Sequence, residues 1–268
     1  MQRDEYTTIP RVNVLGVGIS DLNLESATKC LLELSEIPEL QGYVTITGVH
    51  GVVESQADEE LKKIHNQSLL TTPDGMPMVW FGNWSGYRDM DRVYGPDLML
   101  ELLGVGGKKH YLFGGAEGVA ELLEKKLCKK FPQITIVGRN TPPFRPLSEE
   151  ELESFHQELQ TLQPNFVWVG LSTPKQERFM HGFLKKYPNL TRNWDHGLVF
   201  LGVGAAFDFH SGIIKQAPRW IQRSGFEWLF RTLMDPRRLL KRYAVSNTIF
   251  VSKVIPQMMG LKNYPMPR

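Results

Sequence analysis

The sequence of 268 residues has only two cysteines and no long uninterrupted apolar run. Cys30 and Cys128 lie in helix-like stretches without metal-ligand spacing, which argues against a disulfide framework and fits a reducing compartment. The best candidate for a membrane span, residues 249–261, is interrupted by Ser252, Lys253, Pro256 and Gln257. It falls short of the roughly 18 apolar residues that a span needs, so any membrane contact is expected to be peripheral.

The N-terminal ten residues are polar and lack the apolar core of a secretory signal, so we expect the chain to stay in the cytoplasm. The formal net charge of +2 is too small to indicate a nucleic-acid-binding protein by itself. With 41% hydrophobic residues, the chain can bury one large core. We therefore expect one main domain and a small appendage.

Short apolar, β-branched runs alternate with longer helical patterns between Val12 and Val203. The runs that predict buried strands are VNVL, YVTIT, HYLF, ITIV, FVWVG and LVFLGV. The patterns that predict helices are Leu24–Leu34, Asp58–Asn66, Ala116–Lys130, Ser148–Leu162 and Lys175–Lys186. This alternation predicts an α/β fold with a mostly parallel sheet and flanking helices, and ligands of such sheets bind at the carboxyl ends of the strands.

The composition changes after Gly212. Residues 215–243 carry eight Lys and Arg residues against only Glu227 and Asp235, with aromatic and aliphatic residues interleaved at helical spacing. Basic amphipathic helices of this kind bind anionic membrane surfaces. A helical cap with a solvated charged face explains the composition equally well. We expect a catalytic domain over residues 1–211 and a basic, amphipathic helical appendage over residues 212–268.

Two acidic motifs are candidates for chemistry. Asp74 lies in LLTTPDGMPMVW, where it is expected in a loop before an apolar helix; taken alone, a turn or cap is its simpler role. Asp89 and Asp91 form a D-x-D pair, an arrangement that many nucleotide-sugar enzymes use to hold a divalent metal. Because this pair follows a loop-like stretch instead of a buried strand, we expect it to be exposed and assign no metal ligand.

Phosphate-binding chemistry is possible where strands end. In FVWVGLSTPKQERF, Lys175 and Gln176 enter the first turn of a helix, whose free N–H groups suit a phosphate; an ordinary strand-to-helix turn is the alternative. Asp208 is placed to accept hydrogen bonds from a base or ribose, or to be a buried structural aspartate. The stretch HYLFGGAEGVAELL, followed by Arg139, also permits an NADP-dependent oxidoreductase, although its glycine spacing departs from the dinucleotide fingerprint.

Seven ordered motifs between about Val12 and Tyr243 resemble the WecG/TagA/CpsF family of bacterial glycosyltransferases. They are TPDGMPMVW, RVYGPDLM, LFGGAEGVAE, TPPFRPLSEEE, GLSTPKQE, GVGAAFDFHSG and APRWIQRSGFEWLFRTLMDPRRLLKRY. The resemblance implies a Rossmann-like core with a C-terminal helical appendage. It further implies inverting, metal-independent transfer of a hexose or N-acetylhexosamine-type sugar from a UDP-sugar to a polyprenyl-diphosphate-linked saccharide, in exopolysaccharide or cell-wall glycopolymer synthesis. No cofactor is expected, since the UDP-sugar is a substrate.

The resemblance also implies roles for individual residues. Asp74 becomes the candidate general base, with Arg92 and Gln176 lining the donor or acceptor site. The expected substrate and nucleotide contacts are Thr47, His50, Gly75, Gly114, Gly115, Pro143, Gly170, Lys175 and Asp208. The residues expected against the acceptor or the departing diphosphate, and at the membrane, are Arg231, Arg238 and Lys241. With no metal, positive charge has to come from Arg92, Lys175 and the appendage.

The chain departs from the family pattern in TITGVHGVVE, where many members have an asparagine after the second strand. His50 either replaces a polar contact to the sugar or is structural. The expected partners are a UDP-sugar, a polyprenyl-diphosphate-linked acceptor and the anionic inner face of the plasma membrane, but no nucleic acid; a homo-oligomer is left open. A non-catalytic membrane scaffold with the same fold is the alternative function, and the intact Asp74, Arg92 and Gln176 argue against it.

Overall fold

The computed structural model describes residues 9–267, apart from the side chain of Arg238. Residues 1–8, most of the polar N-terminus discussed above, lie outside the described part. By packing, the chain forms two compact units, which are described in turn. The first unit comprises residues 9–24, Thr45–Tyr94 and 216–267, and the second comprises Glu25–Val44 and Gly95–Lys215. The expected division at residues 211 and 212 concerns function and stays a prediction.

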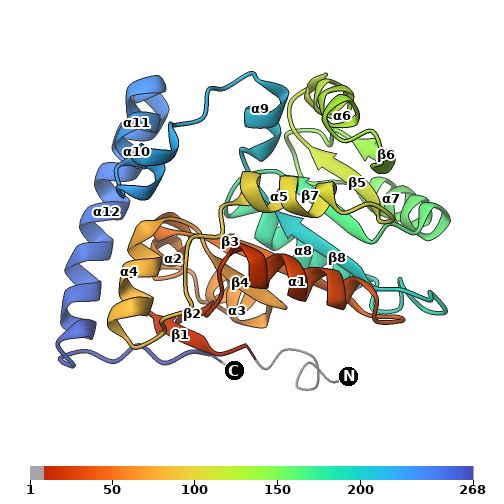
Figure 1. The fold of residues 1–268 in the computed structure, drawn as a ribbon. Coiled ribbons are helices and arrows are strands. Elements are labelled where there is room, and N and C mark those ends of the chain that lie inside the picture. Colours follow the sequence, from red (N-terminus) through yellow and green to blue (C-terminus); the bar gives the residue numbers. More distant parts are fainter. Residues whose placement is uncertain (1–8, 268) are drawn as a thin grey trace. The chain divides into compact units, whose positions relative to one another are not determined.

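Strands and helices alternate along most of the described chain (Figure 1). The strands are β1 (Arg11–Val14), β2 (Val17–Ser20), β3 (Gln41–Thr47), β4 (Leu70–Pro73), β5 (Lys109–Gly114), β6 (Thr135–Asn140), β7 (Phe166–Gly170) and β8 (Leu198–Gly202). The helices are α1 (Leu24–Ser35), α2 (Val49–Glu54), α3 (Glu59–Gln67), α4 (Met76–Trp84), α5 (Gly95–Gly104), α6 (Val119–Lys130), α7 (Glu149–Leu162), α8 (Lys175–Lys186), α9 (Ala206–Ser211), α10 (Arg219–Arg223), α11 (Glu227–Met234) and α12 (Pro236–Met258).

Six strands form one sheet in the order β4-β3-β8-β7-β5-β6. β5 pairs in parallel with β6 and β7, and β7 pairs in parallel with β8. The predicted α/β fold, with a mostly parallel sheet and flanking helices, is confirmed. The run VNVL was wrongly expected to join this sheet: β1 instead pairs antiparallel with β2 in a separate hairpin. Leu15 and Gly16 both have positive φ, as a tight two-residue hairpin turn requires, and this turn reverses the chain.

In the second unit the direction of winding reverses between β5 and β7. The chain leaves β5 through α6 for β6 on one side, then returns through α7 to β7 on the other side and continues through α8 to β8. On the sheet face that carries Tyr111 and Phe113, these side chains pack against Phe155 of α7, and Phe113 also stacks on Phe179 of α8. Such reversal points are where open α/β sheets bind ligands, just beyond the carboxyl ends of the strands.

In the first unit, the C-terminal helix is part of the hydrophobic core. Phe250 and Val254 of α12, and Tyr264 beyond it, are buried with Val14 of the hairpin and Met78 of α4. α12 also packs along α2. Burial of large apolar side chains is the main stabilising contribution in such a core, so the residues after Gly212 are needed to complete it.

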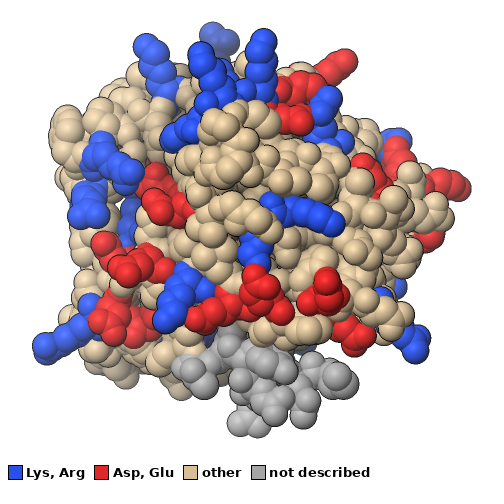
Figure 2. Space-filling view, turned by 45° about the vertical axis from the view of Figure 1, so that its right-hand side comes forward, with Lys and Arg blue, Asp and Glu red and all other residues tan. Residues whose placement is uncertain are grey.

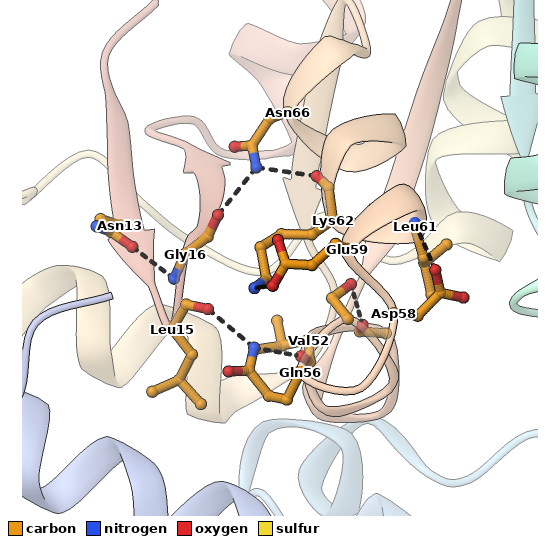
Figure 3. A network of polar contacts seen from close by, with 12 residues as sticks. Asn13, Leu15, Gly16, Val52, Gln56, Asp58, Glu59, Leu61, Lys62 and Asn66 are labelled. Carbon is orange, nitrogen blue, oxygen red and sulfur yellow. Dashed lines mark hydrogen bonds and ion pairs between the residues drawn. The ribbon is translucent and has the colours of Figure 1, made fainter. Parts of the chain in front are cut away.

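Side-chain amides join the hairpin turn to α2 and α3 (Figure 3). Gln56 donates to the carbonyl oxygens of Leu15 and Val52, at 2.8 and 3.0 Å. Asn66 donates to the carbonyl oxygen of Gly16 at 2.9 Å and accepts from the amide of Gly18 at 2.9 Å. The turn therefore has side-chain partners for backbone groups that the short hairpin leaves unpaired.

Within residues 9–267, no helix is long and apolar enough to cross a membrane. On the face shown in Figure 2, Lys and Arg side chains are interspersed with Asp and Glu over much of the surface. For the whole chain, the small net charge of +2 arises from 31 Lys and Arg residues against 29 Asp and Glu residues.

Candidate functional site

Asp74 immediately follows β4 and precedes the turn into α4. Residues 70–73, which were not among the predicted strands, form the buried strand β4, so Asp74 stands at the carboxyl end of a strand. Of the alternatives for Asp74, a turn or a cap, the structure places Gly75 and not Asp74 at the cap position of the next helix. Gly75 is the residue at the helix start, with a φ of +97° and no side-chain cap, and this conformation turns the chain between Asp74 and the helix.

The backbone around Asp74 is held from two sides. Its amide donates to the carbonyl oxygen of Thr47 at 3.0 Å, and the carbonyl oxygen of Pro73 accepts from the amide of Val93 at 2.9 Å. A Cβ atom at Gly48 would lie only 2.4 Å from the carbonyl oxygen of Asp74. Glycine at position 48, the departure noted in the sequence, therefore permits a close approach of two chain segments.

A mostly buried polar cluster in the first unit contains Asp74, Arg92, Tyr94, Glu227 and Arg231; we call it the Asp74 cluster. The side chains of Arg92 and Glu227 form an ion pair and are only 9% and 14% exposed. Tyr94 donates to Glu227 at 2.9 Å, and the Arg92 guanidinium lies 4.0 Å from the centre of the Tyr94 ring. A buried ion pair needs such additional partners to offset its desolvation.

The electrostatics of this cluster include Asp74. Burial, followed by the charge of Glu227, raises the pKa of Tyr94 well above its usual value, so the phenol remains a hydrogen-bond donor. Burial acts to lower the pKa of Arg231, but neighbouring groups reverse this and raise it; they are Tyr243, Tyr94, Glu227 and Asp74. Asp74 thus lies within electrostatic reach of a cation from α11.

Thr47 and His50, expected to contact the donor, have protein partners in the first unit. The Thr47 hydroxyl lies 3.1 Å from Nδ1 of the buried His65. His50, a residue of α2, contacts α12 through its Nδ1, which lies 3.4 Å from the Ser246 hydroxyl. Burial, then the charge of Arg242, lowers the pKa of His50 to about 4, so its ring is neutral at neutral pH. Their roles toward a donor stay predictions.

In the second unit, the expected glycines meet at the reversal point. Gly114 has a φ of +129°, and a Cβ atom there would lie 2.7 Å from the carbonyl oxygen of Gly170. The amide of Gly115 donates to that same oxygen at 3.1 Å, while Phe207 packs against Gly170. The structure thus brings three expected residues together where α/β sheets hold ligands.

Gln176 is buried at the start of α8 and ties this helix to the end of β8. Its side-chain nitrogen donates to the carbonyl oxygen of Gly202 at 3.1 Å, and its oxygen accepts from the amide of Gly204 at 3.0 Å. The same nitrogen donates to the fully buried Glu177, which also accepts from Thr173. Gln176 therefore shapes the segment leading to α9, which carries the part-buried Asp208.

The remaining expected residues are dispersed. Lys175 and Pro143 are exposed in the second unit and Lys241 is exposed on α12, while the side chain of Arg238 lies outside the described residues. Asp89 and Asp91 are exposed in a loop, as expected. Among the described residues, no group of three or more His, Cys, Asp or Glu side chains is arranged to hold a metal ion. Arg139, the candidate for a ribose phosphate, pairs with Glu121 and Glu124.

The chain matches the model of the Glycosyl transferase WecG/TagA/CpsF family over residues 12–264. The chain belongs to this family. It is also similar to the N-acetylglucosaminyldiphosphoundecaprenol N-acetyl-beta-D-mannosaminyltransferase of Bacillus subtilis (strain 168). The two are 27% identical over 214 residues, which cover 78% of each chain. The family resemblance and the assignment as a glycosyltransferase are thereby confirmed.

Three polar residues in these clusters were missed in the sequence. Tyr94 lies inside the motif RVYGPDLM, but nothing in its neighbours marks it as buried. Glu227 was counted only as one of two acids in a basic segment, although an isolated acid there is a signal for an ion pair. Glu177 follows Gln176 in GLSTPKQE, and its position on the buried side of α8 follows from helical spacing with Met180 and Leu184.

Proposed function

We propose that this glycosyltransferase moves a hexose or N-acetylhexosamine-type sugar from a UDP-sugar to a polyprenyl-diphosphate-linked saccharide, with inversion and without a metal. The product would serve exopolysaccharide or cell-wall glycopolymer synthesis. The name of the Bacillus subtilis relative, which specifies an N-acetylglucosaminyl-diphosphoundecaprenol acceptor, supports the acceptor class. The observation that carries the proposal is the Asp74 cluster, where a carboxylate at the end of a strand is joined through the Val93–Pro73 hydrogen bond to the segment that bears the buried Arg92–Glu227 ion pair.

Asp74 is assigned the role of general base. Inversion requires a single displacement: the acceptor hydroxyl oxygen bonds to the anomeric carbon as the bond from that carbon to UDP breaks, and UDP leaves with the electron pair. The hydroxyl proton passes to the Asp74 carboxylate. A base for this step must be held within hydrogen-bond reach of the hydroxyl. The hydrogen bonds at Thr47 and Pro73, on both sides of Asp74, support this assignment because they fix its backbone.

Positive charge for the departing UDP is assigned to arginine and lysine side chains. Arg92 and Arg231 belong to the Asp74 cluster, while Lys175 and Lys241 are exposed on α8 and α12. Preorganised cations stabilise the charge that develops on a leaving group, as a metal ion does in other enzymes. Arg238 is assigned the same role from its sequence motif. The exposed Asp89 and Asp91 are given no part in the reaction.

The nucleotide is assigned to the second unit, at the reversal point between β5 and β7. Gly114 packs directly on the backbone of Gly170, and the side chains of Val119 and Phe207 lie close to Gly115 and Gly170. Asp208 on α9 is the candidate hydrogen-bond acceptor for the base or ribose. Gln176 supports this region through its bonds to Gly202 and Gly204.

We further propose that the C-terminal segment contacts the anionic inner face of the plasma membrane. Several large apolar side chains of α10, α11 and α12, and one directly before α11, are exposed; they are Trp220, Phe226, Leu229, Leu233, Met234 and Leu240. Basic residues accompany them, with Arg219, Arg223, Arg237 and Lys241 also exposed. Apolar insertion together with charge attraction is what peripheral membrane helices use.

The proposed function is tested by UDP release from a panel of UDP-sugars, with a short polyprenyl-diphosphate-linked saccharide as acceptor, in the presence and absence of EDTA. Acceptor-dependent release that survives EDTA, with a product of inverted anomeric configuration by NMR, is expected. Release abolished by EDTA and restored by a divalent metal would contradict metal independence. No release with any donor would contradict the proposed reaction.

A further inference from the structure

Glu227 is a carboxylate enclosed in an otherwise basic segment. It opens α11 within residues 215–243, where Asp235 is the only other acid. Its side chain is only 14% exposed, so it is not part of a solvated charged face. Burying a carboxylate costs several kcal/mol unless partners satisfy it. The buried Glu227 carboxylate is therefore expected to have hydrogen-bonding and charged partners that offset this cost.

Both oxygens of Glu227 are used by residues of another part of the first unit. One oxygen accepts from the Arg92 guanidinium and the other from the Tyr94 hydroxyl at 2.9 Å. Arg92 also donates to Gln222 of α10 at 3.1 Å, and Gln222 donates to the carbonyl oxygen of Ala217 at 2.7 Å. Residues 92–94 are thus attached by side chains to α10 and α11.

The segment of residues 92–94 also contacts the turn that carries Asp74. Val93, between the two partners of Glu227, donates its amide to the carbonyl oxygen of Pro73 at 2.9 Å, and Pro73 directly precedes Asp74. Glu227 and Asp74 are therefore connected through one short segment of backbone. Arg231, one helical turn after Glu227, lies within electrostatic reach of Asp74 from the same helix.

We propose that Glu227 is a positioning residue: by holding Arg92 and Tyr94, it couples the seating of α11 to the placement of Asp74. The inference rests on the proposed function, in which Asp74 is the base. Glu227 itself touches no reacting atom. Its removal releases residues 92–94 and lets both Asp74 and Arg231 move from their working positions.

The test compares Glu227→Gln, Glu227→Asp and Tyr94→Phe in the full-length protein, with Glu33→Gln as the control. Glu33 is an exposed acid of α1 outside the clusters described, with a side chain 66% exposed. kcat and KM for the UDP-sugar are measured per folded molecule, with the folded fraction taken from circular dichroism. A misplaced reacting group costs up to about 100-fold in rate, so we expect Glu227→Gln to lower kcat about 10- to 100-fold.

The KM of Glu227→Gln for the donor is expected to stay within about threefold, since the nucleotide is assigned to the second unit and the charge that Arg92 and Arg231 are assigned to stabilise develops only as UDP departs. Glu227→Asp keeps the charge and is expected to recover part of kcat, and Tyr94→Phe to show a smaller, equally selective loss. A wild-type kcat in Glu227→Gln overturns the inference, as does a loss that vanishes after correction for the folded fraction. Wild-type protein without transfer activity would instead refute the proposed function, before any variant is compared.

Discussion

The amide of Asp74 donates a hydrogen bond to the carbonyl oxygen of Thr47 at 3.0 Å. β3 ends at Thr47 and β4 ends just before Asp74, and the two strands are neighbours in the sheet. The turns that follow them are therefore joined through their backbones. The size of the residue at position 48 is therefore expected to affect the orientation of the Asp74 carboxylate.

Gly48→Ala is predicted to impair both catalysis and stability. The added Cβ would meet the carbonyl oxygen of Asp74 at 2.4 Å, which forces this backbone to move. We expect kcat to fall about 10- to 100-fold, because a misplaced base is inefficient. Overpacking of this kind costs about 1–3 kcal/mol, measured by urea unfolding. Gly182→Ala, in α8 where the new Cβ meets nothing within 4 Å, is the control; it should leave kcat nearly unchanged and raise stability by about 0.5–1 kcal/mol, since alanine is the better helix former.

Asp74→Asn is predicted to abolish turnover while leaving UDP binding largely intact. The amide cannot take the proton of the acceptor hydroxyl, and loss of a general base costs about 10²- to 10⁴-fold in rate. The backbone hydrogen bond from residue 74 to Thr47 does not involve the carboxylate and is retained. Isothermal titration with UDP and a steady-state assay check the two halves of this prediction. Loss of UDP binding in the variant would count against the assigned role.

Glu177→Gln is predicted to make the folding stability of the protein less sensitive to a rise in pH. Burial raises the pKa of Glu177, so the folded state favours the neutral acid. The stabilising effect of this neutral form is fully present below the ordinary pKa near 4.5 and is lost as the pH rises through the raised value. Glutamine resembles the protonated acid and does not ionise. The stability of the variant relative to wild type, from urea unfolding at pH 4.5 to 8, should therefore increase with pH; a constant difference would contradict the prediction.

His65→Asn is predicted to flatten the acid limb of the stability profile. Burial lowers the pKa of His65 to about 4, so protonation below pH 6.5 favours the unfolded chain. Stability is then lost as the pH falls from 6.5 to about 4, at up to about 1.4 kcal/mol per pH unit for this one group. Asparagine reproduces the position of Nδ1 without titrating. Urea unfolding at pH 7, 6 and 5 measures the slopes, and equal slopes for variant and wild type would refute the claim. His110, whose pKa burial also lowers to about 4, should leave a residual slope in the variant.

Membrane contact is best tested with point variants, since deleting the residues after Gly212 would remove Phe250, Val254 and Tyr264 from the core. Trp220 and Leu233 are 74% and 69% exposed. Changing both to serine is expected to reduce recovery with vesicles containing anionic lipid, because apolar insertion is lost. Phe144→Ser, which removes another exposed aromatic residue, is the control. Unchanged recovery of the double variant in a vesicle sedimentation assay would contradict the proposed surface.

Much of the fold was predictable because local patterns report local structure. The five helices predicted from the sequence correspond to α1, α3, α6, α7 and α8, with ends that agree to within a few residues. The capping box of Ser148 and Glu151 marked the start of α7 correctly. Two strands departed from the prediction: VNVL, expected in the main sheet, formed a hairpin, and LTTP, which was not among the predicted strands, formed β4. VNVL pairs with the segment that directly follows it, whereas β4 pairs with β3, which is more distant in the sequence. For strands, pairing of this kind commonly outweighs local composition.

The sequence by itself determined the α/β class, the family and the identity of candidate residues such as Asp74 and Gln176, since these depend on periodicity and on motifs of adjacent residues. Only the tertiary structure decided which of them share an environment. Arg92 and Glu227 are 135 positions apart, and no local pattern relates them. Burial made their pairing energetically necessary, because a carboxylate and a guanidinium removed from water need each other far more than they do on a surface. The link from Glu227 to Asp74 therefore exists only in the folded chain.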